Sequence, residues 1–276
     1  MLSADWPIGR RSPRAARVTR RVVGPLVRLL FRPTLTGVEH LPTEGPYLLV
    51  ANHSAGLGLA ELASFAVLFL AQVDRPLAGF AHPVGFRFWP FHQLHRALGS
   101  VPSTYEDARE ALARGVPLLV FPGGDHETLR PIWQAGRVDF GGRRGFIRVA
   151  QAAGVPIVPM GIRGSHYTVP MLVRARALAW LLVLPRALGV KRWGLSLAGV
   201  LGAAALLALG LPWGVKAPLA FLWLALPFQF FCLIPWTIRL RIGPPLTGFD
   251  QIEDEDGVAA ARDRVQAAVQ ALVSAP

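Results

Sequence analysis

Residues 47–61 read YLLVANHSAGLGLAE and join a short apolar run to a helical pattern. The run at 47–50 is rich in strand-forming residues, which predicts a buried strand. It ends at Asn52 and His53, and small residues and glycines follow before a helical pattern that begins near Leu59. Because open α/β sheets place their sites at the carboxyl ends of strands, we expect His53 to lie in a functional site. A capping Asn52 followed by an incidental histidine is the alternative.

A second apolar strand pattern, residues 116–121, runs into the stretch FPGGDHETLRP at 121–131. The adjacent Gly123 and Gly124 would let backbone N–H groups come close to a substrate, which suits an oxyanion or a phosphate. An ordinary glycine turn is the alternative at this position. Two strands that both end in polar residues predict one shared site at the same edge of a sheet.

Strand and helix patterns alternate along most of the chain. Strand patterns also occur at residues 75–82, 155–160 and 238–242, and helical patterns at 59–72, 106–114, 145–153 and 257–274. Alternation of this kind predicts an α/β fold in which a mostly parallel central sheet is flanked by helices.

The polar residues after the first strand occur in a block that resembles the PlsC-like acyltransferases of glycerolipid synthesis, in the branch of the monoacylglycerol and diacylglycerol acyltransferases. The family block N-H-x-x-x-x-D starts at Asn52-His53, but Gly58 stands where the acid is usual. The branch often carries an acid three residues later, and Glu61 fits that place. The resemblance covers roughly residues 35–170 and implies the α/β fold of that family.

Later blocks of the family follow in the same order. The block F-P-E-G-T-R corresponds to FPGGDH at 121–126, and the branch form F-P-G-G-x-x-E matches through Glu127. Residues 139–143 and 155–159 fit two further blocks. The resemblance implies an O-acyltransferase that moves a fatty acyl group from an acyl thioester, acyl-CoA or acyl carrier protein, to a lipid alcohol. Apart from that co-substrate, no cofactor and no metal is expected.

The resemblance also implies roles for single residues. His53 is expected to act as general base on the acceptor hydroxyl, since a neutral imidazole can accept a proton near neutral pH. Such a base needs an acid to orient its ring, and Glu61 is the expected partner, with Asp125 and Glu127 as rivals. The residues expected to bind substrate are Asn52, Gly123, Gly124, Asp125, His126, Arg130 and Arg143.

Two positions bear on the acceptor, because members that acylate phosphate-bearing acceptors carry arginine there. Tyr105 and His126 occupy these positions here, and neither supplies the fixed positive fork that binds phosphate. We therefore expect an acceptor without a phosphate monoester beside its hydroxyl, although Arg143 is a spare cation. A lysophosphatidic acid (1-acylglycerol-3-phosphate) acyltransferase and a catalytically impaired, membrane-binding homologue are the alternatives.

The composition favours a membrane surface. The 276 residues are 52% hydrophobic and carry a formal net charge of +12 and eight tryptophans, with a mean hydropathy of +0.39. A basic, apolar and tryptophan-rich chain suits an anionic membrane better than nucleic acid, whose binding motifs are not legible. We expect membrane lipids and acyl-CoA or acyl carrier protein as partners, no nucleic acid, and a catalytic domain on the cytoplasmic face of a membrane.

Residues 1–34 are expected to form a basic, amphipathic, membrane-associating arm. Its apolar residues recur at helical spacing among arginines, with a break or kink near Gly24-Pro25. The apolar positions are Val18, Val22, Leu26, Leu29 and Leu30.

Residues 35–276 are expected to form the acyltransferase domain, with a hydrophobic helical hairpin inserted at 195–236. The uncharged runs 195–215 and 217–238 hold 21 and 22 residues, enough for each to cross a bilayer. A half-inserted or a buried hairpin is the alternative. The lone Cys232 lies in this apolar segment and is expected to be buried.

Overall fold

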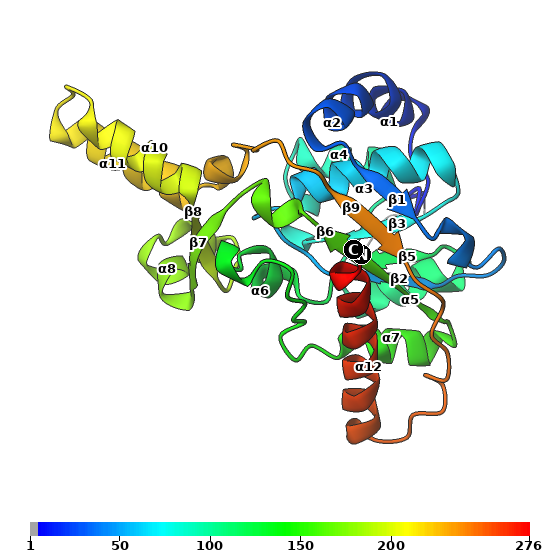
Figure 1. Ribbon diagram of the computed structural model, residues 1–276. Coiled ribbons are helices and arrows are strands. Elements are labelled where there is room, and N and C mark those ends of the chain that lie inside the picture. The colour runs from blue at the N-terminus through cyan, green and yellow to red at the C-terminus, as the bar shows by residue number, and fades with distance from the viewer. Residues whose placement is uncertain (1–4) are drawn as a thin grey trace.

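The computed structural model describes residues 5–276; residues 1–4 of the expected arm lie outside the described part. A seven-stranded sheet in the order β1-β9-β6-β2-β5-β3-β4 forms its centre (Figure 1). Every neighbouring pair is parallel except β6 and β9. The strands are β1 Thr34–Thr36, β2 Leu48–Ala51, β3 Ala78–Ala81, β4 Val101–Pro102, β5 Leu118–Val120, β6 Ile157–Arg163 and β9 Arg239–Ile242. The predicted α/β fold with a mostly parallel sheet is confirmed.

Helices cover both faces of the sheet (Figure 1). Alternate residues of β2 point to opposite faces, so that Leu48 and Val50 join one core and Leu49 and Ala51 the other. The first core is closed by α5 Tyr105–Ala113, α7 Gly145–Ala153 and α12 Glu255–Ser274, and the second by α2 Gly24–Phe31 and α3 Leu59–Gln72. Two further helices, α4 Phe91–Leu98 and α6 Gly124–Thr128, complete the body.

The arm is helical from residue 13 to residue 31. The expected break is a π-helical turn, Thr19–Val23, between α1 Pro13–Val18 and α2. A wider turn at this point accommodates Pro25, which has no N–H to donate. Val27 and Phe31 of α2 are buried in the core shared with α3. Four of the five predicted apolar positions are instead exposed, and these are Val18, Val22, Leu26 and Leu29.

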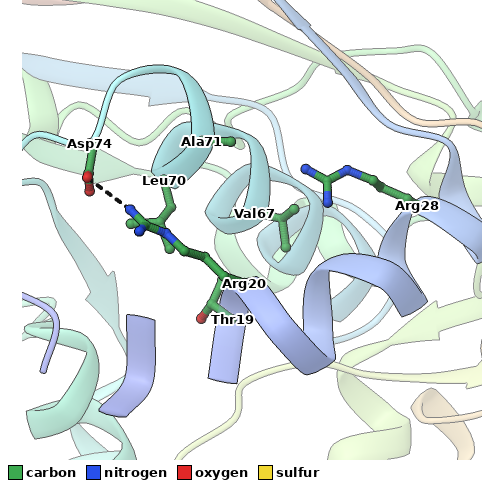
Figure 2. Close-up of a pocket in the computed structure, with 7 residues that line it drawn as sticks. All are labelled: Thr19, Arg20, Arg28, Val67, Leu70, Ala71 and Asp74. Atoms are coloured by element: carbon green, nitrogen blue, oxygen red, sulfur yellow. Dashed lines mark hydrogen bonds and ion pairs between the residues drawn. The ribbon is translucent and has the colours of Figure 1, made fainter. Parts of the chain in front are cut away.

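Beside this packed contact, a groove runs between the arm and α3 (Figure 2). Arg20 reaches across it to Asp74 at 3.0 Å, and Val67 and Leu70 of α3 line its wall. Since α3 also carries Glu61 in its first turn, the arm packs against the helix that supports the candidate site.

A smaller unit follows β6, and the sequence patterns did not predict its strands. β7 Met171–Ala175 and β8 Trp193–Ser196 form an antiparallel pair, with α8 Arg176–Leu181 and α9 Leu184–Ala187 between them. From β8 the chain enters α10 Leu197–Ala208 and α11 Trp213–Ala225, which pack together and project from the body (Figure 1).

These helices are shorter than the runs that predicted them. Residues 195 and 196 belong to β8, residues 209–212 turn the chain, and a 3₁₀ helix begins at Pro227, so α10 and α11 hold 12 and 13 residues. Across residues 5–276, no helix combines the length and the apolar character needed to cross a bilayer, so the expected spans are not supported. Cys232, expected to be buried, is exposed.

Candidate active site

The site lies at the carboxyl ends of two adjacent parallel strands. β2 and β5 pair in register, Val50 opposite Val120, so the residues that follow each strand meet at one edge of the sheet. The imidazole of His53 stacks on the ring of Phe121, with 4.4 Å between centroids. The side chain of His53 is 14% exposed, which leaves it partly open to a substrate.

Glu61 holds the imidazole of His53. Its Oε1 lies in short contact with Nδ1 of His53, and its carboxylate also accepts hydrogen bonds from the N–H and Oγ of Ser54 at 3.0 and 2.9 Å. Glu61 is fully buried, so this orientation is fixed by protein groups. With the Nδ1 proton donated to Glu61, the other nitrogen, Nε2, is the one available to accept a proton.

Gly58 explains why the acid comes from Glu61. Gly58 has φ +66°, and a Cβ at this position would lie 2.2 Å from Cε1 of His53 and 2.9 Å from Oε1 of Glu61. The space that an aspartate at position 58 would need is therefore occupied. The turn ends at once in α3, whose first residues bring Glu61 back toward His53.

Glu127 occupies the matching place at the end of β5. Its carboxylate accepts the backbone N–H of His53 at 3.0 Å and that of Asp139 at 2.9 Å, and pairs with Arg130 at 2.9 Å. Burial raises the pKa of Glu127 to about 7, against the opposing effect of Arg130. A Cβ at Gly123 would lie 2.3 Å from Oε2 of Glu127, so the glycine makes room for this carboxylate.

Arg130 is buried behind the loop that carries His53. Its side chain is 2% exposed and pairs with Glu127, while Nε and Nη1 have no hydrogen-bond partner among the described residues. His166 lies close enough for the charge of Arg130 to act on it, and burial followed by that charge lowers the pKa of His166 to about 4. Arg130 therefore faces the protein interior.

Asp125 and His126 are held by arginines and by Asp139. Asp125 forms a short ion pair with Arg143 and a longer one, 3.7 Å, with Arg192. Arg143 also donates to the carbonyl oxygens of Pro122 and Gly123, at 3.0 and 2.8 Å. The His126 ring contacts Asp139 at 2.9 Å, and its carbonyl accepts a short hydrogen bond from Arg174.

Asn52 is turned away from the mouth of the site. Its side-chain amide donates to the carbonyl of Ile162 at 2.8 Å and accepts the N–H of Ile162 at 2.7 Å. This pair ties the end of β2 to the neighbouring strand β6, so Asn52 positions the backbone before His53.

The structure thus brings His53, Glu61 and Glu127 together, while Asp125 makes no contact with the imidazole among the interactions of the described residues. Several partners were not foreseen. Ser54 and Ser165 face each other beside Glu61. Asp139 and Arg174 contact His126, and Arg192 pairs with Asp125. Ser165 follows the third central strand, and that strand end is the signal that points to it. Arg174 and Arg192 lie in the small β7–β8 unit, which had no recognisable pattern.

The structure thus places a histidine, with its ring held by a buried carboxylate, beside the glycine-rich end of a neighbouring strand. Residues 32–163 match the family model described as Acyltransferase. This part of the chain is therefore an acyltransferase domain, as the sequence blocks predicted.

Relatives of this domain occur in bacteria and plants. A protein of Mycobacterium tuberculosis described as uncharacterized is 34% identical over 169 residues, 59% of this chain and 47% of its own. Phytyl ester synthase 2 of Arabidopsis thaliana, a chloroplastic protein, is 31% identical over 135 residues, 46% of this chain and 19% of its own. The chain therefore spans about half the length of the bacterial relative that it matches and less of the plant one.

A solved structure has a similar fold. The 1-acyl-sn-glycerophosphate (LPA) acyltransferase PlsC of Thermotoga maritima aligns with a TM-score of 0.53 over 95% of this chain and 81% of that chain, at 19% identity. At this identity the likeness extends to the fold.

Proposed function

We propose that this protein transfers a fatty acyl group from an acyl thioester to the hydroxyl of a lipid that carries no phosphate beside that hydroxyl. The observation that carries the proposal is the His53–Glu61 pair, which leaves one imidazole nitrogen available beside the glycine-rich end of β5. The acyl donor is acyl-CoA or acyl carrier protein.

In the proposed reaction, Nε2 of His53 takes the proton of the acceptor hydroxyl as its oxygen attacks the thioester carbonyl. The imidazolium that forms is stabilised by the Glu61 carboxylate, which is already hydrogen-bonded to it. When the tetrahedral intermediate collapses, the C–S bond breaks and the thiolate takes up the proton from His53. The products are the lipid ester and the free thiol.

The oxyanion of that intermediate needs donors near the end of β5. The N–H of Gly124 is engaged with the carbonyl of Phe121 at 3.2 Å, whereas the N–H of Gly123 donates to no protein acceptor within the described residues. We assign the Gly123 N–H as a candidate oxyanion donor. Because Gly123 has no side chain, no Cβ stands beside this N–H, and the Glu127 carboxylate fills the space that a Cβ would take.

The acceptor proposal is supported by the state of the arginines. Phosphate recognition uses a guanidinium fork that is free to bind both oxygens. Arg130 keeps Nε and Nη1 unpaired among the described residues, but it is only 2% exposed and bound to Glu127, so it presents no open fork at the surface. Arg143 is bound to two carbonyls and Asp125. The related phytyl ester synthase, by its name, makes an ester of a long-chain alcohol, which fits an acceptor of this class.

A membrane location is supported by the arm. The exposed stripe of Val18, Val22, Leu26 and Leu29 runs along the helix beside exposed arginines, as in helices that lie in a membrane interface. We propose that this face binds anionic lipid, with the catalytic domain on the cytoplasmic side.

The test is acyl transfer by purified protein in detergent. Labelled acyl-CoA and acyl carrier protein would be supplied in separate reactions, each with lysophosphatidic acid, monoacylglycerol, diacylglycerol and a long-chain alcohol at equal concentration. We expect preference for a phosphate-free acceptor. A preference for lysophosphatidic acid that Arg143→Ala abolishes and Arg148→Ala leaves intact would replace this proposal with the phosphate-bearing alternative. Absence of transfer to every acceptor would favour the impaired homologue.

A further inference from the structure

Helices α10 and α11 form a second projection, distinct from the amino-terminal arm of residues 1–34. This pair of helices is called the arm here, and its outer surface is apolar on all sides apart from Lys216. They meet the body at their base, through β8 and the 3₁₀ helix Pro227–Phe230 (Figure 1). Between Arg192 and Arg239, Lys216 is the only charged residue of the sequence. The exposed large side chains along the two helices include Val200, Leu201, Leu207, Leu219, Phe221 and Leu222. A helix that is apolar all round belongs in a protein core or in lipid. The exposed surface of α10 and α11 therefore requires an apolar partner outside the chain.

The contact between the two helices is of the kind found in membranes. Gly199 and Ala203 are the buried residues of α10, and a Cβ at Gly202 would lie 2.4 Å from the Trp223 ring nitrogen of α11. That nitrogen donates within the pair, to the carbonyls of Ala198 and Gly199 at 3.3 and 3.0 Å. Small residues that let helix backbones approach closely, with polar groups satisfied between the helices, characterise helix pairs in lipid.

The length of α10 and α11 matches the hydrocarbon thickness of one leaflet of a bilayer. Helices of 12 and 13 residues are about 18 and 20 Å long, whereas the hydrocarbon of one leaflet is about 15 Å thick, half of a core of about 30 Å. The base carries groups suited to lipid headgroups: Trp180 is 65% exposed with Arg186 over its ring at 4.7 Å, and Lys191 is exposed nearby in the sequence.

We propose that α10 and α11 insert together into a single leaflet of an anionic membrane, with the α8–α9 segment at the headgroups. The inference extends the membrane association proposed above and does not depend on acyl transfer. Lipid is favoured over a second protein copy because the exposed Trp180 and the basic Arg186 and Lys191 lie at the base, while the side chains along the shaft are apolar up to Trp213 and Lys216 at the tip.

Insertion would place the active site at the membrane surface. Phe230, at the base of the arm, packs on the loop after His53, since a Cβ at Gly56 would lie 2.9 Å from its ring. Ala55 of the same loop shares an apolar cluster with Phe230 and Ala225. A lipid alcohol in that leaflet would therefore reach His53 without leaving the membrane interface.

Lys216 near the tip is the one residue that opposes insertion. Its ammonium lies 4.3 Å from the centroid of the Trp213 ring, which replaces part of the water that the charge would lose. Replacing this lysine with leucine should strengthen membrane binding severalfold, because the cost of placing the charge at depth is removed.

Depth can be measured with one fluorophore at two places. The exposed Cys232 serves as the base position, and Leu211→Cys in a Cys232→Ser background serves as the tip. Each cysteine would carry an environment-sensitive fluorophore, in vesicles of phosphatidylcholine and phosphatidylglycerol with spin labels either near the headgroup or near the chain end. We expect the tip to be quenched more by the deep label and the base more by the shallow one.

Three results would overturn the proposal. Equal shallow quenching at both positions would mean an arm that lies flat, and quenching of the tip by an impermeant agent trapped inside the vesicles would mean a span. No quenching of the tip by either lipid label would mean that protein covers the tip. Light scattering of the detergent-free sample would then show an oligomer. Each leaves acyl transfer in detergent unaffected.

A charge-insertion pair provides a second measurement. Leu201→Glu combined with Leu222→Glu should lower vesicle partitioning at high salt by at least about tenfold, since a carboxylate is costly in the leaflet. Ala260→Glu, on the exposed side of α12, adds charge away from the arm and should leave partitioning unchanged. Unchanged partitioning of the double variant, with a native circular dichroism spectrum, would contradict insertion.

Discussion

The ends of β2 and β5 meet the same steric condition with different results. At each, glycine stands where the family carries an acid, and a glutamate three or four residues later fills the space: Glu61 beside Gly58, and Glu127 beside Gly123. Glu61 reaches the imidazole of His53, whereas Glu127 reaches only the backbone N–H of that residue and is tied to Arg130. Two acids that lie beside glycines in the same way thus have different contacts. Glu61 is placed to orient the imidazole of His53, and Glu127 is placed to hold the loop.

The largest effect should come from the base that both acids support. His53→Ala removes the proton acceptor, and turnover should fall by ~100- to 10,000-fold in the detergent assay. His92→Ala, on α4 and outside the site, is the matched control and should keep normal turnover. Near-normal turnover of His53→Ala would show that the residues at this edge of the sheet do not carry the reaction.

Amide substitutions at Glu61 and Glu127 test whether the two acids differ in role. Glu61→Gln keeps the shape of the side chain but removes the charge that stabilises the imidazolium, so turnover should fall by roughly 10- to 1,000-fold. Glu127→Gln should change turnover by less than about threefold, because this carboxylate does not touch the imidazole. A larger loss for Glu127→Gln than for Glu61→Gln, with both variants folded, would reverse the assignment of the two acids.

Restoring the family acid at position 58 should be harmful while Glu61 is present. Gly58→Asp would push the His53 ring aside, and a displacement of about 1 Å costs on the order of 100-fold in rate. The double variant Gly58→Asp with Glu61→Ala should recover part of that loss, since the introduced carboxylate then has room to meet the imidazole. Both variants would be compared by single-turnover kinetics. If the double variant is as slow as Glu61→Ala alone or slower, the two positions are not interchangeable.

The smallest effect concerns pH and stability. The pKa of Glu127, about 7 in the folded protein, lies above its ordinary value of 4.5, so between these pH values the folded chain holds a proton that the unfolded chain loses. The stability from this proton is complete below about pH 4.5 and is lost as the pH rises through about 7. Thermal unfolding midpoints from about pH 5 to about pH 8 should therefore fall less steeply for Glu127→Gln than for the parent. Glu110→Gln, exposed on α5, should follow the parent, and parallel profiles for all three proteins would contradict the shifted pKa.

Much of this arrangement is legible in the sequence, because it depends on local patterns. The apolar run before Asn52 and the glycines after Phe121 predicted the two strand ends, and the helix 59–72 was predicted with the bounds that the structure has. The family resemblance named Glu61 as the expected partner of His53, but local patterns alone did not show that it reaches the ring, since this depends on the left-handed turn at Gly58. Pairing of Arg130 with Glu127 was also hidden, because burial of an arginine is a tertiary property.

The bounds of α10 and α11, in contrast, could not be predicted from the sequence. Counting uncharged residues in 195–238 gave two lengths suited to a bilayer, but Ser196 caps α10 while its neighbours join a strand, and Pro212 and Pro227 bound α11. Hydropathy measures composition over a window, whereas helix ends depend on caps, prolines and strand pairing. The β7–β8 unit was missed for a related reason, since its strands are short and pair only with each other.

The position of β9 in the sheet determines when the sheet can be completed during synthesis. Within the described sheet, β1 pairs with β9 alone, although about 200 residues separate them along the chain. During synthesis from the amino end, β1 has no neighbour in the sheet until β9 has left the ribosome, while α10 and α11 emerge earlier. In the membrane arrangement proposed above, α10 and α11 would reach the bilayer before the sheet is complete. Strand β9 would then join the sheet in a chain that is already at the membrane.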